Sequence, residues 1–344
     1  MSPISRGTLV VLACLALAVG ITGCNKPPAG EPQPAAKQPA ATAPQAPAKK
    51  VKIGFSAPGA DHAWVAAIIA NAQAEADRDP NLELVPTNAD NNSTKQISDV
   101  EDLITKRVDA MVLLPHEGGP LTPVCAKVKA AGIPLVNLDR EIKSEDYYLW
   151  LGGDNEGIGR AAGEYIAKRL DGKGSVVEIQ GIAGISVTNL RSKGFHEVIK
   201  KFPDIKVVAS QPADFLLEKA MSVMENLLQA HKKIDAVFTH DDEMALGCIR
   251  AIMNAKRDKE MFVTGAGGLK HAIKRIRDGN SPMVATFLYL PTMGGSAVRL
   301  AARIARGQGL DELWERDMPR RILIRAATVT KENADQYYDP KSAY

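Results

Sequence analysis

The chain has 344 residues, of which 45% are hydrophobic and 24% are charged, and its formal net charge is +3. These fractions are typical of a globular protein with room for about two domains, and they exclude a chain that is disordered throughout. Basic and acidic residues are interleaved, so the charge pattern gives no reason to expect a nucleic acid partner.

The first 23 residues have the pattern of a secretory signal peptide. A short basic region with Arg6 precedes the apolar segment 8–20, which is too short to span a bilayer comfortably. The signal ends in I-T-G-C, which resembles the lipobox where a bacterial signal peptidase cleaves before a cysteine that becomes diacylated. We therefore predict lipidation of Cys24 and anchoring to a membrane surface by two lipid chains. The alternative is a plain signal peptide with a cysteine there by chance.

Residues 24–50 connect this signal to the rest of the chain. After Cys24 they repeat proline and alanine without a hydrophobic period. Such a composition predicts a semi-rigid, extended tether that holds a folded body away from the membrane.

From Val51 onward, short apolar strands alternate with amphipathic helices. This alternation predicts an α/β protein with parallel sheets and helices on both faces. The predicted strands are 51–57, 82–87, 110–115, 133–139, 148–153, 175–180, 205–210, 236–240, 261–265, 283–289 and 322–328, and the predicted helices include 64–77, 95–106, 157–170, 217–230 and 244–255.

The number of predicted strands is large for one sheet, so we predict two doubly wound, Rossmann-like lobes. No linker rich in Gly, Ser or Pro separates them, and we expect the chain to cross between them through short hinges that allow closure around a ligand. The expected crossings lie near 153–155, 289–291 and 319–323. The N-terminal lobe would hold residues 51–153 and 291–320, and the C-terminal lobe residues 154–290 and 321–344.

The strand within I-P-L-V-N-L-D-R, residues 133–140, ends in an adjacent acid and base. It is apolar on both faces, as a buried parallel strand should be, and its carboxyl end carries Asp139 and Arg140. Ligands of open α/β sheets bind just outside the carboxyl ends of the strands, where these two groups would offer acceptors and donors to one polar solute. An ordinary salt bridge at a strand end is the alternative.

Two other motifs suggest chemistry, and we interpret both as structural. Residues 157–162, G-I-G-R-A-A, fit the G-x-G-x-x-A of dinucleotide-binding proteins, but close helix packing needs the same small residues. Residues 240–243, H-D-D-E, include metal-ligand types, but consecutive side chains at a strand-to-helix turn point in different directions. We expect one of them to face the cleft, with Asp242 and Glu243 as caps or first-turn acids.

Catalytic and metal-binding motifs are missing from the sequence. It contains no G-x-S-x-G, no H-E-x-x-H and no Walker A loop. Cys125 and Cys248 stand alone in helical patterns without a C-x-x-C partner, so we expect them in the core. We predict no metal, no cofactor and no enzymatic activity.

Taken together, the strand ends resemble those of the ribose-type (type 1) periplasmic binding proteins, the solute receptors of carbohydrate ABC importers. The resemblance covers essentially all of residues 51–330 and implies two lobes joined by three crossings, with a sugar held between them. The segments that carry it are V-K-I-G-F-S, D-A-M-V-L-L-P, G-I-P-L-V-N-L-D-R, G-D-N-E-G-I-G-R-A-A-G, Q-G-I-A-G-I-S, Q-P-A-D-F and H-D-D-E-M-A-L-G.

The resemblance also implies which residues bind the ligand. Two aromatic faces, Trp64 and Phe215, would sandwich the apolar C–H face of a sugar ring, while charged groups satisfy its hydroxyl rim. Core packing is the alternative for both rings. The matching positions are His62 and Trp64 in the first-strand loop, Asp139 and Arg140 as the acid and base that grip hydroxyls, Phe215 as the second stacking aromatic, and Asp241 where the family has Asn or Asp.

Three further ligand-binding positions depart from the ribose pattern. Asn189 replaces an arginine, Gly267 an aspartate and Tyr289 a glutamine. A charge pair would be lost and an aromatic gained, which argues against ribose because a site built for particular hydroxyls rejects mismatched ones. We expect another pentose, hexose or polyol, with fewer polar contacts to the lobe that carries Gly267.

These observations predict a lipid-anchored substrate-binding protein in the periplasm or on the cell surface. As a monomer, it would deliver a monosaccharide or polyol to an ABC permease in the inner membrane. The first alternative is a sensory receptor of the same fold that binds a non-sugar or signalling molecule. The second is an exported enzyme acting on sugars, against which the missing catalytic motifs argue.

Overall fold

A computed structural model describes residues 50–310, 318–342 and 344 of the chain. The predicted signal peptide, the lipidation of Cys24 and nearly all of the tether fall on residues 1–49, outside the described residues. Within the part that is described, no helix is both long enough and apolar enough to cross a membrane. Both lobes described below belong to one compact unit that begins at Ala48.

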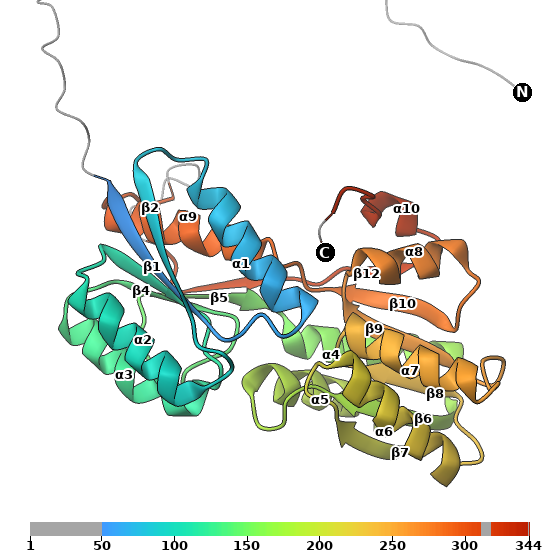
Figure 1. Ribbon diagram of the computed structural model, residues 1–344. Coiled ribbons are helices and arrows are strands. Elements are labelled where there is room, and N and C mark those ends of the chain that lie inside the picture. The colour runs from blue at the N-terminus through green and yellow to red at the C-terminus, as the bar shows by residue number, and fades with distance from the viewer. Residues whose placement is uncertain (1–49, 311–317, 343) are drawn as a thin grey trace, which may run out of the picture. The chain divides into compact units, whose positions relative to one another are not determined.

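The first lobe is a parallel sheet with helices packed on it (Figure 1). Helices α1 and α9 pack on each other, as do α2 and α3. The strand order is β11-β5-β4-β3-β1-β2, and every pairing is parallel. The elements are β1 (Val51–Ala57), α1 (Ala63–Ala76), β2 (Leu82–Asn88), α2 (Ser93–Thr105), β3 (Ala110–Leu113), α3 (Gly118–Ala130), β4 (Leu135–Leu138), β5 (Leu149–Gly153), α9 (Met293–Ala305) and β11 (Arg321–Ile324).

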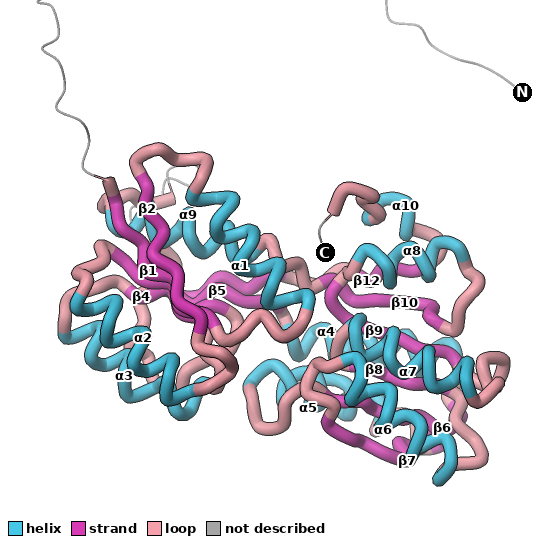
Figure 2. Tube along the Cα trace, in the orientation of Figure 1, coloured by secondary structure: helices cyan, strands magenta, loops and turns pink. Residues whose placement is uncertain are grey.

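The second lobe repeats this arrangement of one sheet and its helices (Figure 2), except that one edge strand is antiparallel. The strand order is β12-β10-β9-β8-β6-β7, and β12 runs antiparallel to β10. The elements are α4 (Asn155–Arg169), β6 (Lys173–Gln180), α5 (Ser186–Ile199), β7 (Asp204–Pro212), α6 (Leu217–Ala230), β8 (Ala236–Thr239), α7 (Asp242–Asn254), β9 (Phe262–Gly267), α8 (Lys270–Asp278), β10 (Met283–Leu288), β12 (Thr328–Thr330) and α10 (Ala334–Tyr337). The prediction of two doubly wound lobes is confirmed.

The burial pattern explains why these segments form these elements. Every residue of β3 and β4 is buried, because helices cover both faces of the sheet. On α6 the buried residues recur at helical spacing, as on any helix that packs one face on a sheet. Cys125 and Cys248 are free and buried, as predicted for core residues.

Gly159 of the G-I-G-R-A-A segment serves helix packing, together with Gly194 on the facing helix. A Cβ added at Gly159 would clash with the carbonyl oxygen of Arg191 on α5, and one at Gly194 would clash with the carbonyl oxygen of Glu156 on α4. The backbones of α4 and α5 therefore approach so closely that no side chain fits between them.

The chain passes between the lobes at three places. It leaves the first sheet at Gly153 and starts α4 at Asn155, and it returns between Leu288 of β10 and Met293 of α9. These two connections overlap the expected crossings at 153–155 and 289–291. The third lies between Ile324 of β11 and Thr328 of β12.

The predicted position of the third crossing, 319–323, is wrong. The apolar run that we assigned to one strand, 322–328, is two strands in two different sheets. Arg321 pairs with Trp150 and Ile324 with Gly153, so residues 321–324 belong to the first sheet and not to the C-terminal lobe. Periodicity does not show this division, since both halves are extended and only the pairing partner changes.

Candidate ligand-binding site

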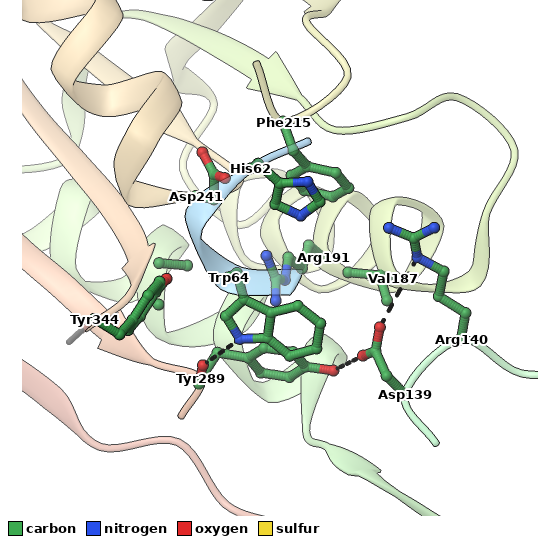
Figure 3. Close-up of a pocket in the computed structure, with 12 residues that line it drawn as sticks. His62, Trp64, Asp139, Arg140, Val187, Arg191, Phe215, Asp241, Tyr289 and Tyr344 are labelled. Carbon is green, nitrogen blue, oxygen red and sulfur yellow. Dashed lines mark hydrogen bonds and ion pairs between the residues drawn. The ribbon is translucent and has the colours of Figure 1, made fainter. Parts of the chain in front are cut away.

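A pocket lies where the carboxyl ends of strands from both sheets meet (Figure 3). Its volume is about 30 Å³. This is room for roughly one or two water molecules, so a larger solute enters only when the lobes or the lining side chains move apart. The lining residues are His62, Trp64, Asp139, Arg140, Val187, Arg191, Phe215, Asp241, Ala266, Gly267, Tyr289 and Tyr344.

Eight of the nine predicted ligand-binding residues line this pocket, and Asn189 does not. Asn189 is exposed and donates from Nδ2 to the carbonyl oxygen of Gly184 at 3.2 Å. Arg191 lines the pocket instead. Two residues along a helix are about 200° apart around its axis, so these side chains lie on opposite faces of α5. The pocket therefore has a basic residue on α5, at Arg191 and not at Asn189.

Asp139 and Arg140 are both 3% exposed and form an ion pair, with Asp139 Oδ2 4.0 Å from Arg140 Nε. Tyr289 donates its hydroxyl to the other carboxylate oxygen. Burial raises the pKa of Asp139, against the opposing effects of Arg140 and Tyr289. The two side chains form the salt bridge that was the alternative interpretation, and both also line the pocket.

The guanidinium of Arg140 is held at the carboxyl end of β3. Its Nη1 donates to the carbonyl oxygen of His116 at 2.8 Å and more weakly to that of Pro115 at 3.4 Å. Burial lowers the pKa of Arg140 from its ordinary value. The group nevertheless remains a cation, because the ordinary pKa of arginine is far above neutral.

Arg191 is the basic residue of the second lobe in the pocket. Its Nε donates to Asn155 Oδ1 at 2.9 Å, and its Nη1 donates to the carbonyl oxygen of His240. Its Cζ lies 4.6 Å from the centroid of the Tyr289 ring, within the range of a cation–π contact. Three partners therefore fix the position of this guanidinium before any ligand arrives.

The segment 240–243 divides its roles as the sequence suggested. Asp241 faces the pocket and caps α7 by accepting from the backbone N–H of Met244 at 2.7 Å, and burial raises its pKa well above the ordinary value. Asp242 and Glu243 lie in the first turn of the helix. His240 pairs with Glu178 at 3.0 Å. Within the described residues there is no cluster of three His, Cys, Asp or Glu side chains able to hold a metal.

Asp242 holds the loop that follows β9 through hydrogen bonds. Its Oδ2 accepts from the backbone N–H groups of Gly268 and Leu269, both at 2.8 Å, and its Oδ1 accepts from the Thr286 hydroxyl at 2.7 Å. Burial raises the pKa of Asp242 to about 6. This carboxylate holds the wall of the pocket at Gly267 without lining the pocket itself.

The aromatic rings pair differently from the predicted sandwich. The His62 ring stacks on Phe215, with centroids 5.9 Å apart and an interplanar angle of 21°. Trp64 packs on Tyr289 at 5.3 Å and donates its Nε1–H to the Tyr289 carbonyl oxygen at 2.8 Å. Figure 3 shows one pair above the other. Trp64 and Phe215 therefore each face a ring from another segment, and no open space separates Trp64 from Tyr289 or Phe215 from His62.

Two of the pocket residues hold strained backbone conformations. Asp139 has φ 62° and Phe215 has φ 65°, a region that non-glycine residues rarely adopt. At Asp139 the neighbouring strand holds this conformation, because its N–H donates to Leu151 and its carbonyl accepts from the Trp150 indole. The turn also ends β4 at Leu138, one residue before the predicted end. Strain of this kind clusters at functional sites.

Two aromatic rings lie directly on glycine backbone. A Cβ added at Gly181 would clash with the Phe215 ring, and one at Gly153 would clash with the Tyr289 ring. These glycines were a sequence signal that we did not use, because their role depends on which ring covers them.

Contacts between the lobes close the pocket. Glu243 Oε2, on α7 of the second lobe, accepts from the backbone N–H of Ala63 at the start of α1 in the first lobe, at 2.7 Å. His62, the N-cap residue of α1, makes no capping hydrogen bond with its side chain. The other lobe therefore supplies the cap of α1, and this contact depends on closure.

The sequence did not identify Val187, Arg191, Ala266 and Tyr344 as pocket residues. Helical periodicity on α5 places Val187 and Arg191 on one face, four residues apart, and this was the available signal. For Tyr344 no local pattern exists, because only the path of the chain after α10 brings it to the pocket.

The two lobes, the three crossings and the pocket between strand ends define a solute receptor. The model of the periplasmic binding protein domain family matches residues 53–309, and this chain belongs to that family. It is 34% identical over 248 residues to the ribose import binding protein RbsB of Salmonella typhimurium, covering 72% of this chain and 82% of that protein.

Solved structures share the fold. An ABC transporter solute binding protein from Mycobacterium smegmatis with bound glycerol is 33% identical, with a TM-score of 0.78 over 86% of this chain and 99% of that chain. The fructose binding periplasmic domain of the hybrid two component system BT1754 is 31% identical, with a TM-score of 0.76 over 83% of this chain and 92% of that chain.

Proposed function

We propose that this protein is the substrate-binding component of an ABC importer and binds a monosaccharide or polyol between its lobes. The observation that carries the proposal is the pocket itself, in which buried charged groups and aromatic faces from both lobes converge. The relatives support this solute class, since they are named for ribose or fructose or were solved with glycerol.

The charges of the pocket suit a neutral solute rich in hydroxyls. The acidic side chains of Asp139 and Asp241 match the guanidiniums of Arg140 and Arg191 in number. Charged groups form stronger hydrogen bonds with hydroxyls than neutral groups do, and the pocket offers both acceptors and donors. The aromatic faces provide the apolar surface that the C–H side of a sugar ring needs.

Closure of the lobes couples binding to transport in this proposal. The pocket volume of about 30 Å³ requires an open form for entry. A ligand that contacts both lobes stabilises the closed form, because only there are all its contacts made. The closed form is the one that a permease in the inner membrane recognises.

We further propose that the protein acts as a monomer, exported to the periplasm or the cell surface and held there by a lipid on Cys24. The support is the sequence I-T-G-C at the end of an apolar segment, followed by a Pro/Ala-rich tether. Export without a cofactor suits a receptor that has no chemistry of its own.

A sensory receptor of the same fold is the second candidate. The similarity to the periplasmic domain of a hybrid two component system favours it. In that case the closed form signals to a membrane kinase, and the bound molecule can be a sugar or another signal. A neighbouring gene for a permease and an ATPase, rather than for a kinase, separates the two candidates.

A thermal-shift screen tests the proposed function. The protein without its first 24 residues is melted with pentoses, hexoses, inositols and linear polyols at millimolar concentration. A ligand present at 100 times its Kd stabilises the folded state by about 2.7 kcal/mol, which raises Tm by several degrees. A cooperative melt that no sugar or polyol shifts contradicts the proposal.

A further inference from the structure

The end of the described chain returns to the pocket. After α10 the chain turns back, and Tyr344 lines the pocket next to Ala266 and Gly267. Its exposed fraction is 7%. Figure 3 shows its ring on the side of the pocket opposite Asp139 and Arg140.

Hydrogen bonds hold the segment before Tyr344 against the second lobe. Lys270, the first residue of α8, donates from Nζ to the carbonyl oxygen of Ser342. The Ser342 hydroxyl donates to the carbonyl oxygen of Tyr344 at 2.7 Å and accepts from its N–H at 3.2 Å. The position of the tyrosine is therefore determined by its own segment and by α8.

Tyr344 and Gly267 share one place in the wall of the pocket. Gly267 has φ 136°, which strongly favours glycine, and a Cβ there would clash with the hydroxyl oxygen of Tyr344. The strand end thus contributes no side chain at this point, and the phenol occupies the space. The two residues form a single surface from segments far apart in the sequence.

The hydroxyl of Tyr344 is a hydrogen-bond donor with no partner among the described residues; the hydrogen bonds of Tyr344 use its backbone N–H and C=O. Burial raises the pKa of Tyr344 well above its ordinary value, and the nearby carboxylates of Asp242, Asp241 and Glu243 raise it further. The phenol therefore keeps its proton at neutral pH and remains a donor.

We propose that Tyr344 determines the specificity of the ligand pocket in two ways. Its hydroxyl donates a hydrogen bond to one hydroxyl of the solute on the side of the second lobe, and its ring closes the pocket beside Gly267 to solutes longer than one ring. This inference rests on the proposed function, because it assigns a further role within the same pocket.

The test compares variants that separate the hydroxyl from the ring. Tyr344→Phe removes only the hydroxyl, Tyr344→Ala also removes the ring, and Tyr337→Ala is the matched control. Tyr337 lies in α10, is 36% exposed and is not among the pocket residues. All are made in the protein without its first 24 residues, which retains the whole compact unit from Ala48. Calorimetry measures their affinities for D-ribose, D-fructose, D-allose, xylitol, myo-inositol, sucrose and melibiose.

We expect Tyr344→Phe to weaken the tightest monosaccharide or polyol by about threefold to tenfold, the effect of one neutral hydrogen bond. Tyr344→Ala should shift the ratio of affinities toward sucrose or melibiose by more than about tenfold, since a closed wall becomes open space. Tyr337→Ala should match the wild type. If Tyr344→Ala does not melt cooperatively, Tyr344→Phe decides the role of the hydroxyl.

Two failures are distinguishable. If the wild type binds a solute of the panel and both Tyr344 variants bind every solute within twofold of the wild-type affinity, the role of Tyr344 is overturned. The proposed function then remains intact. A wild-type protein that melts cooperatively but binds no member of the panel overturns the proposed function, and this inference with it.

Discussion

The two walls of the pocket are built in different ways. The first lobe contributes two pairs of residues that are close in sequence, His62 with Trp64 and Asp139 with Arg140. The second lobe contributes residues from five segments: Val187 and Arg191 on α5, Phe215 after β7, Asp241 after β8, Ala266 and Gly267 at the end of β9, and Tyr344 after α10. Tyr289 lies between them, at the crossing that follows β10. The sequence named all four residues of the first wall, but only Phe215, Asp241 and Gly267 of the seven in the second wall.

The walls also differ in how their charges are fixed. In the first lobe Asp139 and Arg140 pair with each other at one strand end, and the Tyr289 hydroxyl and the His116 carbonyl hold them further. In the second lobe Arg191 is held by Asn155 and the backbone of His240, while Asp241 is held by its own helix. Replacing Asp139 or Arg140 therefore breaks the ion pair between two pocket residues. Replacing Arg191 or Asp241 instead breaks hydrogen bonds to groups that do not line the pocket.

The largest expected effect belongs to the first wall. Asp139→Ala should weaken binding of the sugar or polyol found in the thermal-shift screen by about 10- to 150-fold, because a charged hydrogen-bonding group is worth about 1.5 to 3 kcal/mol. Calorimetry measures the loss, and the melt should remain cooperative. Asp146→Ala, at an exposed ion pair with Lys129 in the same lobe, should bind as the wild type does. Unchanged affinity in Asp139→Ala contradicts the assignment of this wall.

The second wall is tested by two residues on one helix. Arg191→Met should weaken binding of the same solute by about tenfold or more, because a buried cationic donor is lost while the apolar stem remains. Asn189→Ala should change affinity by less than about twofold, since its side chain is exposed and points away from the pocket. Titration calorimetry on both variants gives the comparison. If Asn189→Ala weakens binding more than Arg191→Met does, Asn189 is the ligand-binding residue of α5, as the sequence suggested.

A glycine that contacts Phe215 offers a subtler change to the second wall. Gly181→Ala should weaken binding by about threefold to tenfold, because the new methyl group displaces the Phe215 ring from its stack on His62. Gly119→Ala is the matched control, since a Cβ there meets only ordinary contacts with Lys143. Tryptophan and tyrosine fluorescence during a ligand titration reports both affinities. Equal affinities in the two variants mean that the Phe215 ring does not contact the solute.

The smallest expected effect concerns the contact between the two walls. Glu243→Gln should weaken binding by about twofold to fivefold, because a neutral amide caps the N-terminus of α1 less well than a carboxylate. Since this contact depends on closure, the variant should be more open without ligand, which small-angle scattering measures. Glu260→Gln, at an ion pair with Arg257 away from the pocket, should change neither property. If Glu243→Gln is as compact as the wild type without ligand and binds the solute with the same affinity, the contact does not stabilise closure.

The sequence by itself determined the alternation of strands and helices, the two lobes and the strand ends that carry chemistry. These features depend on local periodicity and on side chains close in sequence, as the buried strand before Asp139 and Arg140 shows. The tertiary structure decided the rest. Pairing with β5 placed residues 321–324 in the first sheet, helix rotation selected Arg191 over Asn189, and the path after α10 brought Tyr344 to Gly267. In each case the deciding contact joins residues far apart in the chain. Helical periodicity groups Val187 with Arg191, but no local pattern shows which segment that face will meet.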